Sequence, residues 1–361
     1  MRIGFFLRDL KVEGVQVVTL RLAETLALMG HRCELITLNG DQELVLPKNV
    51  IHHNIGFEKN ISYREASKYV QPFLSYLNRL ESDEPFNTIF SVHGETNDII
   101  SFIDDRRLIH CIHNSDEYSY NNKNWFKKLK FKRRFTNKIK GKHIVCVSHG
   151  IKNFVEKHAI GSYLSVSTIY NPFNVDKIIE QAEQEPVYYL PDNYIVFVGR
   201  LEKQKNVFLL LETIARLKSD ISLVIIGQGK LKDKITESAK ELGINHKVII
   251  YPFCQNPYPI IKRAKLLILT SIYEGLPTVL IEALILGTHV MSTNCPTGPS
   301  EILVNHLNKY LIDSYDADKI ASRVDDILLD TTEIDSSAIK NTFCSEAIGK
   351  KYIKFIEEKG L

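Results

Sequence analysis

The chain has 361 residues, 44% of them hydrophobic and 25% charged, with a formal net charge of +3 at pH 7. This length exceeds what one hydrophobic core usually supports and predicts two domains. The composition excludes a disordered protein, and the sequence holds no apolar run long enough to span a bilayer. The first apolar stretch, residues 3–7, is too short for a signal peptide. We therefore expect a cytoplasmic protein whose chain opens with a buried strand.

Short apolar runs alternate with longer amphipathic segments in the first half, which predicts βαβ units and a parallel sheet. A helix is expected over residues 17–29, ending at Gly30. Unbroken hydrophobicity is typical of strands that are buried on both faces. The strand-like runs are residues 2–7, 33–38, 87–92, 107–112 and 143–148.

Residues 176–193 break this pattern, because they are rich in Glu and Gln and contain two prolines, and they are interpreted as a linker. A second alternating series follows, with strands at 194–199, 222–227, 247–253, 265–270 and 288–293. Helices are expected around 207–217, 230–242, 257–264 and 279–287, and an amphipathic helix over 344–360. The prediction is two parallel α/β domains, residues 1–180 and 190–340, followed by a C-terminal helix over 341–361.

The six cysteines lie far apart and form no CxxC pair or Cys/His cluster. Several lie in or beside apolar runs, where a cysteine behaves as a small hydrophobic residue. Their spacing favours reduced thiols in a cytosolic setting and predicts no structural zinc site. The residues are Cys33, Cys111, Cys146, Cys254, Cys295 and Cys344.

Ligands of open parallel sheets bind beyond the carboxyl ends of the strands. Gly199 and Arg200 follow one predicted strand, and Lys205 lies five residues further on. The glycine lets a ligand approach the backbone, and each charge-assisted contact to a diphosphate is worth about 1.5–3 kcal/mol. The alternative is a solvated basic loop before a helix.

A second motif runs from Ser271 to the helix that contains Glu282. Pro277 suits the first turn of a helix and Gly275 a tight preceding turn, so that free N–H groups at the helix start can hold phosphate oxygens. Glu274 lies in the loop, and Glu282 lies about one turn inside an otherwise apolar helix, where a carboxylate needs a hydrogen-bonding ligand or a cationic partner. A structural ion pair is the alternative.

Two residues of the first half also follow predicted strands. His113 comes after the strand at 107–112. A lone histidine is more often structural, and this position makes a functional role an equal alternative. Gly14 lies in the loop after the first strand, where a glycine allows close approach of a phosphate or sugar, although no GxGxxG motif accompanies it.

These motifs resemble the donor site of the retaining GT-B glycosyltransferases of family 4. The resemblance rests on Gly199-Arg200, on Lys205, and on two glutamates separated by seven residues in EGLPTVLIE. The segment 298–303, GPSEIL, is similar to members that make bacterial surface polysaccharide and lipopolysaccharide. The likeness covers nearly all of the second half and implies a GT-B fold, with two Rossmann-like domains facing a central cleft and the final helix crossing back to the first domain.

The resemblance also implies roles for the residues of the second half. Arg200 and Lys205 would neutralise the leaving diphosphate, Glu282 would hold the ribose hydroxyls, and Glu274 would contact the donor sugar. Main-chain groups at the helix start would hold the sugar and the phosphates. These residues are Gly275, Leu276, Pro277, Thr278 and Val279.

In the first half, the resemblance places His113 near the transferred sugar, so His113 and Glu274 are the expected catalytic residues. It places Gly14 in a loop that closes over the diphosphate. The family often has two adjacent glycines where this chain has Gly14-Val15, a departure that concerns the loop geometry rather than the class.

The mechanism implied by the resemblance is a front-face attack in which the leaving phosphate deprotonates the acceptor hydroxyl. Fixed cations and helix N–H groups stabilise the developing charge, and no DxD motif stands in a suitable place, so we expect no metal and no cofactor. The expected donor is a hexose or N-acetylhexosamine on a nucleotide diphosphate, with UDP as the nucleotide and GDP-mannose as the alternative. The expected acceptor is a glycan or a lipid-linked glycan.

Residues Lys123–Lys142 contain ten Lys or Arg, no Asp or Glu, and interleaved aromatic residues. Such a segment is attracted to an anionic membrane by about 1 kcal/mol per cation, and its aromatic residues suit the interface. We expect peripheral binding at the inner face of the cytoplasmic membrane, with a solvated basic helix as the alternative. Nucleic acid is not expected, because no binding module surrounds the run.

Two other functions stay open at this point. A sugar-nucleotide epimerase of the same fold would release an altered sugar without any acceptor. A non-catalytic sugar-nucleotide-binding subunit would need none of the transfer chemistry. An enzyme is favoured over a non-catalytic subunit, because the sequence keeps all four donor-site residues: Arg200, Lys205, Glu274 and Glu282.

Overall fold

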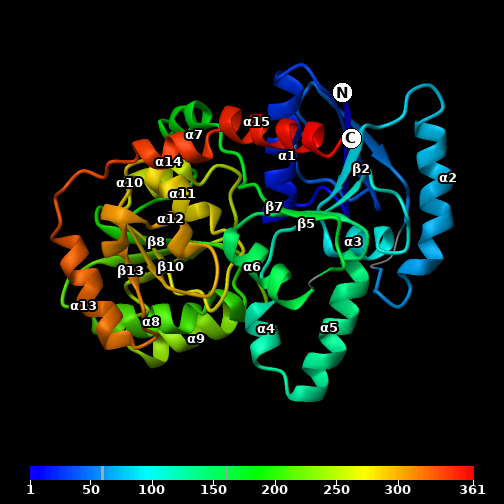
Figure 1. Ribbon diagram of the computed structural model, residues 1–361. Helices are drawn as coiled ribbons and strands as arrows, with labels where there is room; N and C mark the ends of the chain where they lie inside the picture. The colour runs from blue at the N-terminus through cyan, green and yellow to red at the C-terminus, as the bar shows by residue number, and fades with distance from the viewer. Residues whose placement is uncertain (58–60, 160) are drawn as a thin grey trace. The chain divides into compact units, whose positions relative to one another are not determined.

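The computed structural model describes residues 1–57, 61–159 and 161–361 and divides into two compact units. Unit 1 contains Met1–Phe173 and Phe343–Leu361, and unit 2 contains Asn174–Thr342. Each unit is a parallel sheet covered by helices (Figure 1). The predicted α/β class with two parallel sheets is confirmed.

The described part of unit 1 forms a sheet of seven strands in the order β3-β2-β1-β4-β5-β6-β7, and every pairing is parallel. The order changes direction between β1 and β4, which makes the carboxyl ends of these two strands the topological switch point of the unit. The strands are β1 (Arg2–Leu7), β2 (Arg32–Thr37), β3 (Val50–Asn54), β4 (Thr88–Ser91), β5 (Leu108–Ile112), β6 (His143–Cys146) and β7 (Ser165–Thr168).

Both faces of the unit 1 sheet are covered by apolar side chains. Phe5 packs in a cluster on one face, and its neighbour Phe6 packs in a second cluster on the other face, because successive residues of a strand point to opposite sides. This explains why the strand has no polar alternation. The helices are α1 (Gly14–Leu28), α2 (Val70–Leu80), α3 (Gly94–Ile100), α4 (Glu117–Asn121), α5 (Trp125–Ile139), α6 (His149–His158) and α15 (Ser345–Glu358).

Helix α15 belongs to unit 1, although it follows unit 2 in the chain. It packs beside α1 (Figure 1), and Tyr352 meets the ring of Phe90 edge-on at 5.3 Å. The two chain segments that border unit 2 are joined by backbone hydrogen bonds: Phe173 N donates to Phe343 O at 2.9 Å, and Ser345 N donates to Phe173 O at 2.9 Å.

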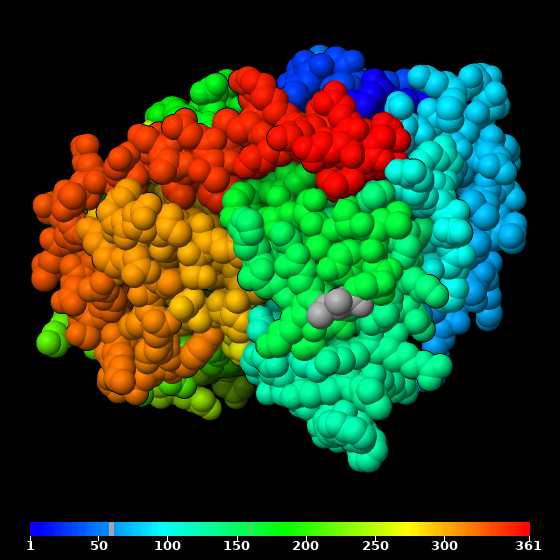
Figure 2. Space-filling model, viewed as in Figure 1, coloured from blue at the N-terminus to red at the C-terminus, as the bar shows by residue number. Residues whose placement is uncertain are grey.

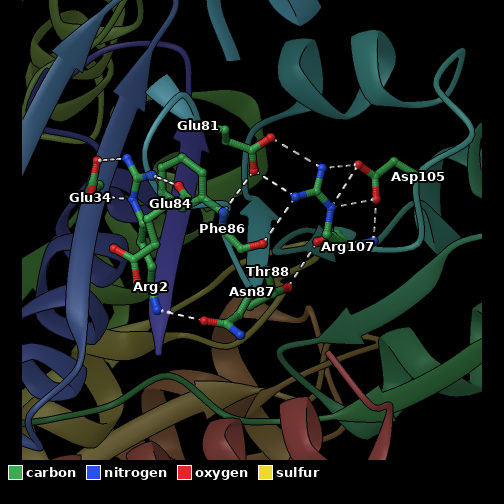
Figure 3. Close-up of polar contacts among 9 residues, drawn as sticks. All are labelled: Arg2, Glu34, Glu81, Glu84, Phe86, Asn87, Thr88, Asp105 and Arg107. Carbon is green, nitrogen blue, oxygen red and sulfur yellow. Dashed lines mark hydrogen bonds and ion pairs between the residues drawn. The ribbon is translucent and has the colours of Figure 1, made fainter. Parts of the chain in front are cut away.

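A network of ion pairs lies at the amino ends of the unit 1 strands (Figure 3). Arg2 Nε contacts Glu34 Oε1 at 2.7 Å, and Arg107 bridges Glu81 and Asp105, each at 2.7 Å. Burial alone would raise the pKa of Glu34, but hydrogen bonds from His53 and Arg2 lower it to about 2. These ion pairs join β1 to β2 and the segment before β5 to the end of α2, at the edge opposite to the one where ligands of such sheets bind.

The described part of unit 2 forms a sheet of six strands in the order β10-β9-β8-β11-β12-β13, again with parallel pairing. The strands are β8 (Tyr194–Val198), β9 (Ser222–Ile226), β10 (Val248–Tyr251), β11 (Leu266–Leu269), β12 (Val290–Thr293) and β13 (Leu311–Ile312). The helices are α7 (Val175–Ala182), α8 (Val207–Arg216), α9 (Lys232–Glu241), α10 (Tyr258–Arg263), α11 (Thr278–Ile285), α12 (Pro299–Ile302), α13 (Ala317–Leu328) and α14 (Ser337–Phe343). The described residues also contain short 3-10 turns, at Ala66–Tyr69 in unit 1 and at Lys203–Lys205 and Asn305–Tyr310 in unit 2.

The segment interpreted as a linker, residues 176–193, is not all irregular. It overlaps helix α7, which packs against α10 and α11 within unit 2. Its Glu and Gln residues face solvent, while Ile178 and Ala182 are buried. The helix ends at Ala182, and the rest of the segment, which holds both prolines, is irregular up to β8.

Candidate functional site

The predicted donor-site residues of unit 2 lie at the carboxyl ends of β8 and β11, which are neighbours in the sheet. Strand order changes direction between these two strands, so this edge is the switch point of unit 2. Gly199 and Arg200 directly follow β8, and the loop from Thr270 to Pro277 follows β11. The sheet topology thus brings two distant sequence motifs to one place.

An ion pair between Lys205 and Glu274 lies at the centre of this edge. Lys205 Nζ is 2.6 Å from Glu274 Oε1, and the Ser271 hydroxyl donates to the same oxygen at 2.6 Å. The two charged side chains are only 14% and 6% exposed. A lysine ammonium has three donors, so a phosphate oxygen can bind Lys205 while Glu274 holds it in place.

Arg200 lies apart from this buried pair, at the surface. Its side chain is 51% exposed, and its guanidinium lies 3.5 Å from both Glu202 and Gln204. Gln204 in turn donates to Tyr273 O at 2.9 Å, in the loop that carries Glu274. The structure therefore joins Lys205 directly to Glu274 and connects Arg200 to the same loop through Gln204.

The turn at Gly275–Pro277 is held by residues that follow β12. The Thr297 hydroxyl donates to Glu274 O. Gly298 has a φ of +93°, and a Cβ there would lie 2.5 Å from Pro277 Cδ, so only glycine fits. Within the described residues no side chain caps the N-terminus of α11, and its first N–H groups are left to bind an anion.

Glu282 lies one turn inside α11 and is 7% exposed. The Tyr258 hydroxyl, from α10, lies 3.4 Å from Glu282 Oε1. A tyrosine hydroxyl thus contacts the buried carboxylate, which sequence reasoning expected to have a hydrogen-bonding ligand or a cationic partner. The other turn residues named above, Leu276 and Val279, are 7% and 8% exposed, and Thr278 is half-buried.

Sequence reasoning missed a pair of glycines in the loop after β9. A Cβ on Gly227 would lie 1.9 Å from Gly199 O, and a Cβ on Gly229 would lie 2.5 Å from Leu201 O. The β9 loop therefore packs directly on the backbone that carries Arg200. The signal was present, because the sequence SLVIIGQG places both glycines directly after a buried strand.

In unit 1, His113 directly follows β5, and its Nε2 atom is buried without a hydrogen-bond partner among the described residues. Burial and the neighbouring His93 lower the pKa of His113 to about 4. His93 precedes α3, accepts a hydrogen bond from Glu95 N at 3.4 Å through Nδ1, and also has a pKa lowered to about 4, mainly by burial. Both imidazoles are therefore neutral at neutral pH.

Gly14 is the first residue of α1 and is exposed. Nothing in the described residues lies within 4 Å of a Cβ placed on it. The fold of unit 1 alone does not require glycine at this position, in contrast to Gly227 and Gly298 of unit 2.

Two further searches cover only the residues that the structure describes. In that part of the chain, no group of three His, Cys, Asp or Glu side chains is arranged to hold a metal ion. No helix there is both long and apolar enough to cross a bilayer.

Two family profiles match adjoining parts of the chain. The profile described as Glycosyltransferase Family 4 matches residues 12–177, and the profile described as Glycosyl transferases group 1 matches residues 179–343. Together they span most of both units.

Among curated relatives, a Campylobacter jejuni protein named N-acetylgalactosamine-N,N'-diacetylbacillosaminyl-diphospho-undecaprenol 4-alpha-N-acetylgalactosaminyltransferase is 37% identical over 134 residues, 37% of this chain and 36% of its own length. The lipopolysaccharide 1,6-galactosyltransferase of Salmonella typhimurium is 33% identical over 172 residues, 45% of this chain and 46% of its own. The chain thus spans less than half the length of these relatives.

Solved structures share the fold over nearly the full chain. The protein HepE of Anabaena, crystallised with UDP and glucose, superposes with a TM-score of 0.74 at 16% identity, covering 99% of this chain and all of its own. The lipopolysaccharide outer core galactosyltransferase WaaB in its apo form gives a TM-score of 0.71 at 21% identity, with the same coverage of 99% and 100%.

Proposed function

Because the chain belongs to the GT-B glycosyltransferases of family 4, we propose that it transfers a sugar from a nucleotide diphosphate to a glycan or glycolipid acceptor. The donor is a hexose or N-acetylhexosamine on UDP, the anomeric configuration is retained, and the product serves surface polysaccharide or lipopolysaccharide synthesis. The observation that carries the proposal is the buried Lys205–Glu274 pair beside the uncapped start of α11.

This arrangement suits a reaction whose main task is to stabilise a leaving diphosphate. The bond between the anomeric carbon and the diphosphate oxygen breaks, and a bond from the acceptor oxygen to that carbon forms on the same face. The acceptor proton passes to the leaving phosphate. Lys205, Arg200 and the N–H groups of α11 stabilise the charge that develops on the phosphates. Lys205 and the N–H groups are already held in place for this task.

The remaining site residues position the donor in this proposal. Glu282 holds the ribose hydroxyls, Glu274 contacts the sugar, and the backbone from Gly275 to Val279 holds the sugar and the phosphates. For unit 1 we propose that Gly14, at the start of α1, contacts the diphosphate and that His113 contacts the transferred sugar. In this proposal side chains and backbone groups stabilise the negative charge on the leaving phosphates, so it includes no metal and no cofactor.

Nucleotide choice and activity can be tested with the full chain. We expect UDP-sugars to raise the melting temperature more than GDP-mannose, since a ligand at 100 times its Kd adds about 2.7 kcal/mol of stability. With an acceptor present, nuclear magnetic resonance should show a new glycosidic bond with the donor's anomeric configuration. Conversion of the donor to a free epimer without any acceptor would instead identify an epimerase, and binding without turnover would identify a non-catalytic subunit.

The acceptor class rests on names of relatives and on one helix of unit 1. The Campylobacter jejuni relative acts, by its name, on an undecaprenol-linked glycan, which supports a lipid-linked acceptor. In this chain α5 carries most of the basic run, and its first residues expose Trp125 (67%), Phe126 (75%) and Leu129 (58%). In the space-filling view the tip formed by α4 and the start of α5 projects from unit 1 (Figure 2).

We propose that this tip binds an anionic membrane at the cytoplasmic face. The distal end of α5 is anchored by buried Phe135 and Ile139 and by ion pairs of Arg134 and Lys138 with Asp98. The exposed aromatic residues are thus held on a rigid helix whose surroundings attract anionic lipid.

Sedimentation with vesicles containing phosphatidylglycerol tests the membrane proposal. Neutralising Lys127, Lys128 and Arg133 should weaken binding by about fivefold per cation, from about 1 kcal/mol each. Replacing Trp125 and Phe126 by Ser should weaken it further. The control Tyr189→Ser removes an aromatic residue of unit 2 that is 84% exposed. Undiminished binding by the α5 variants would reject the proposal.

A further inference from the structure

Each of the two glutamates in the motif after β11 accepts a hydrogen bond from a hydroxyl group. Ser271 donates to Glu274 from within the motif, whereas Tyr258 donates to Glu282 from outside it. Tyr258 belongs to α10, which follows β10, a strand at the other end of the sheet from β12 and β13. The proposed donor chemistry gives Tyr258 no role, although it contacts the carboxylate that is proposed to hold the ribose.

The contact joins a phenol to a carboxylate in a mostly buried place. The Tyr258 hydroxyl donates to Glu282 Oε1 at 3.4 Å, and the two residues are 6% and 7% exposed. An ionised carboxylate only accepts hydrogen bonds, whereas a phenol can donate one. A hydrogen bond to an ionised group is stronger than a bond between neutral groups. The phenol therefore restrains the direction of one oxygen of the Glu282 side chain.

Helix α10 holds this phenol in place. Tyr258 is the first residue of the helix, and Tyr258 N donates to Asn256 Oδ1 at 3.2 Å. The Asn256 amide in turn donates to Gln181 O of α7 at 2.9 Å. Two residues further along α10, Ile260 O accepts a hydrogen bond from the buried hydroxyl of Tyr194 in β8. Because α10 is bonded to both α7 and β8, it offers the Tyr258 hydroxyl to Glu282 at a fixed position.

A fixed carboxylate matters for a ligand with neighbouring hydroxyl groups. A ribose presents two hydroxyls on adjacent carbons, and the two oxygens of one carboxylate can accept a hydrogen bond from each. A carboxylate that turns freely loses that freedom on binding, which weakens the complex. A 2′-deoxyribose lacks one of the two donors, and a site built to bind a hydroxyl discriminates against a ligand without it. The direction of Glu282 thus controls how strongly a ribose is preferred.

We propose that Tyr258 is a positioning residue that aligns Glu282 on the ribose hydroxyls of the donor, and that the site thereby selects ribonucleotides over 2′-deoxyribonucleotides. Tyr258 acts through Glu282 and touches neither the transferred sugar nor the phosphates. The proposal rests on the transferase function above. It applies to a uridine and to a guanosine donor alike, because both carry the same ribose.

The test compares Tyr258→Phe with the wild-type full chain by isothermal titration calorimetry, with UDP, GDP and their 2′-deoxy analogues as probes. In the wild type, the tighter-binding ribonucleotide should have a Kd about tenfold lower than its deoxy analogue. In Tyr258→Phe this ratio should fall about fivefold, because mainly the ribonucleotide loses affinity. A ratio that the variant leaves unchanged overturns the proposal, even if both affinities fall. A wild type that shows no preference, or binds neither ribonucleotide, overturns it as well.

Two further variants separate positioning from packing. Tyr310→Phe removes the hydroxyl of another buried tyrosine of unit 2, which contacts His289 Nδ1 at 3.0 Å. It should lower the melting temperature and leave the preference for ribose unchanged. In a Glu282→Ala background, Tyr258→Phe should have no further effect on ribonucleotide affinity, because the side chain through which it acts is absent. Equal loss of preference in Tyr310→Phe contradicts the proposal, and so do additive effects in the double variant.

Turnover separates this proposal from the proposed function. With an acceptor present, Tyr258→Phe should raise the KM for the donor about fivefold and leave kcat nearly unchanged, because the ribose is bound equally in the ground state and the transition state. A lower kcat at an unchanged KM overturns the proposal. A chain that selects ribonucleotides through Tyr258 but transfers no sugar would disprove the transferase function and leave the positioning role standing. Transfer that continues with an unchanged ribose preference in Tyr258→Phe would do the reverse.

Discussion

The carboxyl edges of the two sheets hold different chemistry on the same topology. In unit 2, a largely buried lysine pairs with a single glutamate, and glycines let neighbouring backbone segments pack directly against one another. In unit 1, the carboxylates of Asp9, Glu13 and Glu95 share the guanidinium of Arg8 beside two neutral histidines. The same topology thus places a cation beside a helix start in unit 2 and a surplus of carboxylates in unit 1.

Removing the lysine of unit 2 should have the largest effect. Lys205→Ala is expected to lower the transfer rate by a factor on the order of 10² or more, because it removes a fixed positive group from the leaving diphosphate. It also leaves Glu274 buried without its cation, which costs about 3–5 kcal/mol of stability. The matched control is Lys203→Ala, an exposed lysine two residues away.

A double variant separates the two consequences of that change. Lys205→Ala with Glu274→Gln removes the unpaired charge, so the melting temperature should recover while the transfer rate stays low. Recovery of both the melting temperature and the rate would show that the ion pair serves only the fold of unit 2.

The close packing of backbone in unit 2 predicts the next largest effect. Gly227→Ala should destabilise the protein by about 1–3 kcal/mol, as overpacking does, because its Cβ would lie 1.9 Å from Gly199 O. Urea unfolding followed by circular dichroism measures this as a lower midpoint. An unchanged midpoint would mean that the loop after β9 moves aside to admit the methyl group. Unit 2 would then be less tightly packed, relative to unit 1, than the structure indicates.

The histidines of unit 1 predict a dependence of stability on pH. The pKa of His113 is about 4 when folded, against an ordinary value of 6.5. Below pH 6.5 the unfolded chain therefore binds a proton that the folded chain does not, and stability falls as the pH drops toward 4, by about 1.4 kcal/mol per pH unit. His113→Asn should lose less melting temperature between pH 7 and 5 than the wild type does. The exposed His306 provides the control variant His306→Asn, which should follow the wild type.

The open surroundings of Gly14 in unit 1 predict the smallest effect on stability. Gly14→Ala should change the free energy of unfolding by less than about 1 kcal/mol, and in the stabilising direction, because alanine restricts the unfolded chain. Because the proposed function places the donor's diphosphate beside Gly14, the KM for the donor should rise severalfold in the same variant. A loss of stability as large as that of Gly227→Ala would show that Gly14 is packed as closely as Gly227. The two units would then not differ in the packing of these glycines.

The central strands could be predicted from the sequence because burial on both faces leaves a continuous apolar run, as in β8 and β11. The strands β3 (VIHHN), β7 (SVST) and β13 (LI) were missed. They lie at sheet edges, are short or half-buried, and keep polar residues, so their hydrophobic pattern does not stand out.

The candidate site divides in the same way. Lys205 and Glu274 could be predicted because each lies in a local motif with turn and helix signals of its own. The contacts of Arg8 and Asp9 could not, because Glu95 reaches Arg8 from the first turn of α3 and Gln16 reaches Asp9 from inside α1. Their proximity depends on which strands are neighbours, and local sequence patterns do not contain that information.

The hydrogen bonds that join Phe173 to Phe343 and Ser345 have a consequence for biosynthesis. Unit 1 is built from two separate segments of the chain. Helix α15 covers apolar residues of α1, and these residues are synthesised long before α15. Until unit 2 has been translated, that surface stays open to chaperones or to aggregation. Folding of the first unit is thus completed by a segment that is synthesised after the second, and a stop codon placed just after residue 342 would leave unit 2 complete but remove the last segment of unit 1.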